Sequence, residues 1–340
     1  MLSADIVLAT QLSESDVQAI DRLRAAHDRL LQELGRVIVG QRDVIERLSI
    51  CLFARGHALL MGVPGLAKTL LVSKLAETMS LDFSRIQFTP DLMPMDITGS
   101  DILQDGADGR REFHFVRGPV FANIVLADEI NRAPPKTQAA MLEAMQETHV
   151  TAVGRTFPLQ PPFLVLATQN PVEQEGTYPL PEAQLDRFMF LIELDYPTEA
   201  EEIEIARTTT GDQLPELQHL LTATEILQHQ TLVRRVPVPD HIYTYAAQLV
   251  RKTRPADSTA PGWLGPLVSW GAGPRAVQNL ILGAKARAAL LGSYMVGLED
   301  IEAVAEPVLT HRVLTTFAAQ AEGVSAKDIV RRLIEETEES

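Results

Sequence analysis

Cysteine is scarce in this sequence, which holds only Cys51 among its 340 residues. A single thiol excludes an intrachain disulfide framework and a zinc site made of thiolates alone, and such cysteine usage is typical of a reducing compartment. Cys51 lies in an apolar helical run, so we expect a buried core residue and not a nucleophile.

Long hydrophobic runs are also missing, and the N-terminus shows no basic segment followed by an apolar one. The sequence therefore predicts neither a membrane span nor a signal peptide and favours a globular, cytoplasmic protein. The hydrophobic content is 46%, and the chain is long enough for two domains and a sizeable core.

Positive charge is in deficit, because 30 basic residues face 45 acidic ones and the formal net charge is −15. This balance opposes non-specific attraction to a phosphate backbone. Nucleic acid is therefore an unlikely partner on charge alone.

The most informative stretch is residues 62–69, which read Gly-Val-Pro-Gly-Leu-Ala-Lys-Thr. The apolar run 58–61 before it is typical of a buried parallel strand, and helical spacing follows it. In this context, backbone N–H groups and the helix dipole form an anion cradle. We expect Lys68 to contact the β and γ phosphates of ATP, and the Thr69 hydroxyl to bind Mg²⁺. The predicted nucleotide-binding residues here are Gly62, Val63, Pro64, Gly65, Leu66, Ala67, Lys68, Thr69 and Leu70.

Ala67 stands where this type of loop usually carries a second glycine. Alanine tolerates helical dihedral angles, so it is acceptable there if it already belongs to the helix N-terminus. The alternative interpretation of the stretch is a Gly/Pro turn that happens to precede a Lys-Thr pair.

A second strand is expected at residues 83–88, and a further apolar strand, residues 124–127, ends in the carboxylates Asp128 and Glu129 about sixty residues after the cradle. The carboxyl ends of parallel strands are where open α/β sheets bind ligands. We expect Asp128 to hold Mg²⁺ through its water shell and Glu129 to polarise the water that attacks the γ-phosphate. The alternative is a strand that runs into an acidic helix cap.

A further buried strand, residues 163–167, leads to Asn170 and a proline. An amide at this strand end can hydrogen-bond the γ-phosphate or the water, and Asn-Pro is equally a common turn initiator. The spacing does not decide between these two interpretations.

Two arginines complete the set of candidate catalytic residues. Arg187 follows Asp186, so it is either half of a surface ion pair or an arginine finger for a neighbouring subunit's nucleotide. Arg275 follows Pro274 at a predicted helix N-terminus, where a cation does not complement the dipole, so we expect it to have an anionic partner.

The periodicity divides the chain near residue 197, into N-terminal helices with an α/β core (1–197) and a helical domain without strands (198–340). Two prolines forbid a regular element in residues 89–96. Hairpins are expected at 100–116, with a turn at 104–109, and at 150–159, with a turn at 154–155. Expected helices include residues 15–34, 135–147, 199–209, 241–251, 274–291, 298–309 and 326–334.

Taken together these residues resemble the MoxR family of AAA+ ATPases over nearly the whole chain. The matching segments are residues 39–41, 62–69, 89–99, 128–138, 167–171, 180–188 and 273–276. Many members carry alanine at the position of Ala67. The resemblance implies an AAA+ P-loop core, with a parallel sheet between helices, and an all-α lid.

The resemblance also implies residue roles. Residues 90–116 would be the helix 2 insert and residues 148–162 the pre-sensor 1 hairpin. The implied functional residues are Val39, Gly40 and Gln41 at the adenine pocket, Asn170 as sensor 1, Arg187 as an arginine finger acting in trans, Arg275 as sensor 2 on the lid, and Arg132 as a second contact between subunits.

MoxR-like proteins are similar to chaperones that couple ATP turnover to maturing, activating or inserting metal into a protein client. The resemblance implies a hexameric ring and a partner with a von Willebrand factor A domain. Two alternatives stay open. An MCM-like nucleic-acid motor would need basic hairpins, and here Arg110, Arg111, Arg117 and Arg155 stand among acids. An ATP-binding scaffold with little turnover would not need residues that activate a water molecule. The intact Asp128–Glu129 pair argues against such a scaffold.

Overall fold

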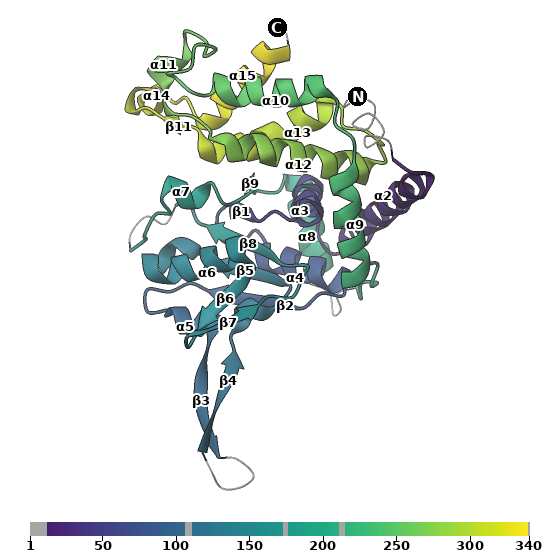
Figure 1. The fold of residues 1–340 in the computed structure, drawn as a ribbon, viewed down its shortest axis with the longest axis vertical. Coiled ribbons are helices and arrows are strands. Elements are labelled where there is room, and N and C mark those ends of the chain that lie inside the picture. Colours follow the sequence, from purple (N-terminus) through teal and green to yellow (C-terminus); the bar gives the residue numbers. More distant parts are fainter. Residues whose placement is uncertain (1–11, 106–110, 173–175, 211–214, 339–340) are drawn as a thin grey trace, which may run out of the picture.

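The computed structural model describes residues 12–105, 111–172, 176–210 and 215–338. Within these residues, the centre of the N-terminal part is a parallel sheet in the order β2-β5-β8-β1-β9 (Figure 1). The strands are β1 (Ala58–Met61), β2 (Phe83–Gln87), β5 (Ile124–Asp128), β8 (Leu164–Gln169) and β9 (Phe190–Glu193). The strands predicted at residues 58–61, 83–88, 124–127 and 163–167 are confirmed, and the apolar residues of β1, β5 and β8 are short runs buried on both faces. The edge strand β2 is more polar and only partly buried.

Helices cover both faces of the sheet, since alternate strand residues enter two separate apolar clusters. One face, which includes Leu60 and Leu126, packs with α2, α3, α4 and the C-terminal helices. The other, which includes Leu59 and Val125, packs with α6. The helices of this part are α2 (Glu14–Leu34), α3 (Arg42–Ala54), α4 (Lys68–Thr78), α5 (Pro94–Thr98), α6 (Pro135–Glu147) and α7 (Glu182–Leu185), with 3₁₀ turns η1 (Pro119–Phe121) and η2 (Ile130–Arg132).

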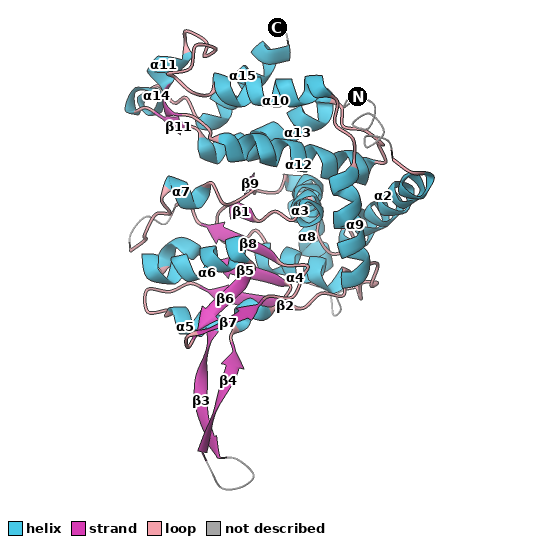
Figure 2. Cartoon of the chain, viewed as in Figure 1, coloured by secondary structure: helices cyan, strands magenta, loops and turns pink. Residues whose placement is uncertain are grey.

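Two antiparallel hairpins extend the core, as the sequence predicted. The first, β3 (Gly99–Asp105) with β4 (Arg111–Arg117), projects away from the sheet (Figure 2). Most of its predicted turn, residues 106–109, lies outside the described residues. The second is β6 (His149–Ala152) with β7 (Arg155–Pro158), and Arg155 belongs to the strand and not to the turn. The stacked rings of Phe115 and Phe157, 4.1 Å between centroids, join the two hairpins.

The C-terminal part is a helical lid, and most of its predicted helices are confirmed. Its helices are α8 (Glu199–Thr209), α9 (Ala223–Arg235), α10 (Asp240–Lys252), α11 (Leu264–Leu267), α12 (Pro274–Leu291), α13 (Leu298–Leu309), α14 (Phe317–Ala321) and α15 (Ala326–Glu338), with the 3₁₀ turn η3 (Thr310–Arg312). The N-terminal helices α2 and α3 pack on α9 and α12. The domain division near residue 197 stays a prediction.

Three expectations about secondary structure need correction. A short antiparallel pair, β10 (Val268–Trp270) with β11 (Leu314–Thr315), interrupts the helical lid, so strands do not stop at residue 197. Pro94 does not forbid a regular element, because it occupies the first turn of α5, where no N–H partner is needed. Helix α9 was not among the expected helices, although Thr222 and Glu225 form a capping box at its start.

Cys51 is fully buried in α3, as expected, and burial raises the pKa of its thiol. In the part of the chain that the structure describes, no helix is both long and apolar enough to cross a membrane.

Candidate active site

The loop between β1 and α4 has the geometry of an anion cradle. Gly65 has φ +90°, and a Cβ added there would meet no heavy atom within 4 Å, so the backbone is open to a ligand. A Cβ on Gly62 would lie 3.0 Å from Leu194, so the start of the loop packs closely against the residue after β9. The Lys68 ammonium group donates to the Gly62 carbonyl at 2.6 Å and therefore lies within the loop. Thr69 follows it in the first turn of α4.

Ala67 does not adopt the helical conformation that we expected. It is the N-cap of α4, in the left-handed region with φ +54° and ψ +24°. Left-handed backbone costs an L-residue roughly 1–2 kcal/mol, which explains why this type of loop usually has glycine there. The loop therefore keeps its shape and accepts strain at one residue.

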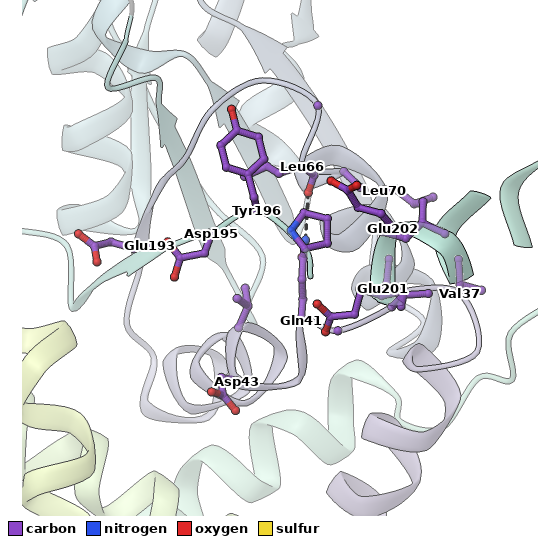
Figure 3. A pocket seen from close by; sticks show the side chains of 18 of the residues that line it. Val37, Gln41, Asp43, Leu66, Leu70, Glu193, Asp195, Tyr196, Glu201 and Glu202 are labelled. Atoms are coloured by element: carbon purple, nitrogen blue, oxygen red, sulfur yellow. Dashed lines mark hydrogen bonds between the residues drawn. The ribbon is translucent and has the colours of Figure 1, made fainter. Parts of the chain in front are cut away.

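Beside the cradle, a cavity of about 700 Å³ opens between the core and the lid (Figure 3). Gln41 donates from Nε2 to the Leu66 carbonyl at 3.2 Å, which joins the segment before α3 to the cradle. Gly40 has φ +82°, and a Cβ there would lie 2.2 Å from the Glu201 carboxylate. The lining includes Val37, Ile38, Val39, Gly40, Gln41, Pro64, Gly65, Leu66, Ala67, Leu70, Tyr196 and the lid residues Glu306, Lys327 and Arg331. The apolar residues of this lining suit an adenine base, and the carboxylates of Asp43, Glu193, Asp195, Glu201 and Glu202 also line the cavity.

The two carboxylates lie at the carboxyl end of β5, as predicted, and neighbouring cations hold both. Asp128 Oδ2 accepts from Arg85 Nη2 at 2.6 Å and from Nε at 3.0 Å. Glu129 Oε2 accepts from Arg132 at 2.8 Å and from Gln87 at 2.8 Å. The contact of Arg132 in this chain is thus with Glu129, and its contact with another subunit stays a prediction.

The charge of Lys68 is balanced by the same carboxylates. Partial burial lowers the pKa of Lys68, and the nearby charges of Asp128 and Glu129 oppose that shift.

Strand β8 lies between β5 and β1 and links their ends. The buried Thr168 hydroxyl donates to Asp128 at 2.6 Å and accepts the Glu129 N–H at 2.8 Å. Asn170 is also buried, and its Oδ1 accepts the Val172 N–H at 3.1 Å. Asn170 therefore does initiate a turn, and its contact with a phosphate stays a prediction.

Arg187 and Arg275 lie together, at the other end of the sheet. Asp186 does not pair with Arg187 but with Arg275 at 3.2 Å and Arg312 at 2.7 Å, which supplies the anionic partner expected for Arg275. Arg187 donates to the Leu142 carbonyl of α6 at 2.9 Å. We name this group of Asp186, Arg187, Arg275, His311 and Arg312 the lid junction.

The lid junction is remote from the cradle of its own chain. Ala58 pairs with Phe190 and Met61 with Glu193 in the parallel strands β1 and β9. Arg187 precedes β9, whereas the cradle follows β1, so the two lie at opposite strand ends, more than about 10 Å apart along the sheet. Arg275 is not among the residues that line the cavity.

Sequence reasoning missed several residues that organise this site. Arg85 and Gln87 alternate on β2 beside the carboxylate strand, and that polar alternation in a strand next to β5 is a signal that could have found them. Thr168 is hidden in an apolar run. Arg312 carries no local signal, because its partners lie 126 positions away in the sequence.

The residues present fit a magnesium nucleotide. The cradle offers open backbone N–H groups and an ammonium group for phosphates, and Thr69 and Asp128 supply the oxygen ligands that Mg²⁺ prefers. This combination of a P-loop, acidic strand end and helical lid defines an ATPase of the AAA class. The family model described as "ATPase family associated with various cellular activities (AAA)" matches residues 57–190, and the AAA lid domain model matches residues 265–333.

Similar proteins identify the family within this class. "Chaperone MoxR1" of Mycobacterium tuberculosis is 44% identical over 308 residues, which cover 91% of this chain and 81% of the relative. The Bacillus subtilis protein YeaC is 42% identical, over 90% of this chain and 92% of the relative. "Protein MoxR" of Methylorubrum extorquens is 33% identical, over 85% and 88%. The chain belongs to the MoxR family of AAA+ ATPases.

A solved structure has the same fold. The crystal structure of a protein from Cytophaga hutchinsonii is 43% identical, with a TM-score of 0.88 over 95% of this chain and 97% of that chain. The predicted AAA+ core with a helical lid is therefore confirmed.

Proposed function

We propose that this protein hydrolyses ATP at sites between subunits of a homo-hexameric ring and uses the turnover to remodel or mature a protein client. The observation that carries the proposal is the position of Asp128 and Glu129 at the carboxyl end of β5, two strands from the cradle that holds Lys68. A binding-only scaffold would need the cradle and not the second carboxylate.

Each residue then has one task. Lys68 leaves the Gly62 carbonyl to neutralise the β and γ phosphates, and the loop N–H groups hold the same anion. Glu129, freed in part from Arg132, orients the attacking water and accepts its proton. Asn170, between the two strands, positions the γ-phosphate. Mg²⁺, held by Thr69 and Asp128, would neutralise developing phosphate charge.

Sheet direction supports the trans role of Arg187. Because Arg187 lies at the amino end of β9, it cannot serve the nucleotide at the carboxyl end of its own sheet. In a head-to-tail ring the same surface faces the next subunit's site. Arg275, paired with the adjacent Asp186, lies on that same surface, and its role as sensor 2 stays a prediction.

The chaperone role is supported by a relative, which is named "Chaperone MoxR1". The partner with a von Willebrand factor A domain, metal insertion into the client and the cytoplasmic location rest on the resemblance described above. Two of the hairpin arginines do not favour a nucleic-acid motor, since Arg155 pairs with Asp101 at 2.6 Å and Arg117 lies over the Phe121 ring.

The catalytic part is tested with Glu129→Gln. This variant should bind ATP with unchanged affinity and lose at least about 10²-fold in turnover, because the amide cannot accept the proton of the water. Normal turnover would refute the role of Glu129. A wild-type rate near background, even with a partner present, would favour the scaffold.

The client is tested by capture on the Glu129→Gln variant held in ATP, followed by mass spectrometry. The Lys68→Ala variant, which should not retain ATP, is the matched control. Nuclease-resistant recovery of a von Willebrand-type protein and a client would support the chaperone role. Recovery of only nuclease-sensitive material would contradict the chaperone role and favour the MCM-like nucleic-acid motor.

A further inference from the structure

The most unusual charged group in the molecule is the guanidinium of Arg312. It lies in the lid, at the end of η3, and its side chain is only 2% exposed. Burial of an unpaired cation is very unfavourable, so each of its donors should have an acceptor.

All five N–H groups of this guanidinium have acceptors. Nε donates to Asp186 Oδ1 at 2.7 Å. Nη2 donates to the carbonyls of Asp186 at 2.9 Å and Phe188 at 2.6 Å. Nη1 donates to the carbonyl of Met189 at 3.3 Å and to that of Val308.

Four of these five acceptors belong to residues 186–189, on both sides of Arg187. The neighbouring His311 ring lies in the same group, with Nε2 3.1 Å from the Phe188 carbonyl and 2.7 Å from Arg312 Nη1. The lid thus holds the backbone before and after Arg187, while the Arg187 side chain itself remains directed at α6.

We propose that Arg312 is a positioning residue for Arg187, which it holds at the angle needed to enter the neighbouring subunit's ATP site. This role rests on the proposed trans action of Arg187. It explains why an arginine is used, since lysine has three donors and cannot bind a carboxylate and three carbonyls in one plane. Because Arg312 belongs to the lid, a lid movement in one subunit would also move the arginine that serves its neighbour.

The first test compares kinetics of Arg312→Met and Arg312→Lys with the wild type. A displaced Arg187 should lower kcat about 10²-fold, because a misplacement near 1 Å can cost that much, and the KM for ATP should change less than about twofold. Arg312→Lys should recover part of the lost kcat. If Arg312→Met does not fold, the comparison of Arg312→Lys with the wild type still tests the proposal.

Arg287→Met is the matched control for lost lid stability. Arg287 is another largely buried lid arginine, 2.7 Å from the buried Asp300, and among the described residues its ion pairs are with Asp300 and Glu46, not with residues 186–189. At temperatures below its melting transition it should keep its turnover. An equal loss of kcat in Arg287→Met and Arg312→Met would overturn the positioning role.

The second test uses mixed rings and separates this proposal from the one it rests on. In the reference mixture, Arg187→Ala subunits carry a working ATP site and Lys68→Ala subunits carry a working arginine, so random head-to-tail assembly restores about one interface in four. Arg312→Met should behave as Arg187→Ala does: it should recover turnover with Lys68→Ala and should not recover it with Arg187→Ala.

Three outcomes would count against the proposal. Recovery with Arg187→Ala and not with Lys68→Ala would mean that Arg312 acts on its own subunit's nucleotide. Wild-type kcat in Arg312→Met would mean that Arg187 needs no such support. Failure of the reference mixture alone would overturn the trans role of Arg187, and the positioning role with it.

Discussion

The two ends of the sheet hold their charged residues in different ways. At the phosphate end, formed by residues 62–69 with Asp128 and Glu129, the carboxylates are held by Arg85, Gln87 and Arg132, all from the core. At the lid junction, Asp186 and the backbone around Arg187 are held by Arg275 and Arg312, which come from the lid.

This difference assigns ATP binding and activation of the neighbouring subunit to different parts of the structure. The phosphate end is built from adjacent strands and can form as soon as the sheet does. The lid junction forms only when the lid packs on the core, so the position of Arg187 depends on how the lid and the core are arranged. ATP binding and activation of the next subunit should therefore respond differently to the same kinds of mutation.

The largest expected effect is that of Arg187→Ala, which removes the contribution of the lid junction to catalysis. Turnover should fall at least about 10³-fold, the usual contribution of an arginine finger, while the affinity for ATP stays unchanged because the phosphate end is intact. Steady-state ATPase assays and fluorescent nucleotide titration measure the two effects. Loss of nucleotide affinity in this variant would contradict the separation of the two ends.

The next largest effect is expected on the free energy of unfolding when the lid junction is mutated. Arg312→Met leaves Asp186 and several carbonyls without their buried donor and should lower the free energy of unfolding by about 3 kcal/mol. Arg275→Met removes only an exposed pair, with side chains 43% and 31% exposed, and should cost less than about 1 kcal/mol. Urea unfolding measures both variants. Equal costs would show that Arg312 is not the principal link between lid and core.

Stability should also depend on pH through His57, which precedes β1 and therefore lies at the amino end of the sheet, opposite the phosphate end, where its carbonyl accepts the Met189 N–H. Burial lowers the pKa of His57 to about 4, and its ring accepts the Val165 N–H at 3.0 Å and contacts the Met145 carbonyl at 3.1 Å. The unfolded chain binds a proton at His57 more readily than the folded chain does. The stability that the neutral, buried His57 contributes is therefore fully present above about pH 6.5 and is lost as the pH falls towards 4.

The loss should amount to about 2–3 kcal/mol over that range. Urea unfolding at several pH values would measure it, with His57→Gln as the comparison. The variant should be less stable at pH 7 and should lose less stability on acidification than the wild type. Parallel pH profiles would exclude His57 as the source.

The smallest expected effect concerns the strained Ala67. Ala67→Gly relieves a left-handed alanine and should stabilise the protein by about 0.5–1 kcal/mol, partly offset by the greater freedom of glycine in the unfolded chain. ATP affinity should stay within about threefold, because the backbone path of the loop is unchanged. Thermal melting and nucleotide titration check this, and a lower melting temperature would show that the left-handed conformation carries no strain.

The sequence by itself determined the elements of the core and the phosphate end. Strand β1, helix α6 and the lid helices α12 and α13 begin and end where apolar periodicity, proline and loop residues place them. Lys68, Thr69, Asp128 and Glu129 were recognisable because a tight loop and a strand end impose local patterns. Those patterns arise from backbone geometry and hydrophobic spacing over a few residues.

Only the tertiary structure decided which charges meet. The Thr168 bridge and the pairing of Asp186 with Arg275 and Arg312 follow no local rule. Arg312 contacts residues more than a hundred positions earlier, and such a contact depends on how the lid packs on the core. That packing decides which hydrogen bonds and ion pairs form between distant segments, and the hydrophobic periodicity of one segment does not predict which other segment it will contact.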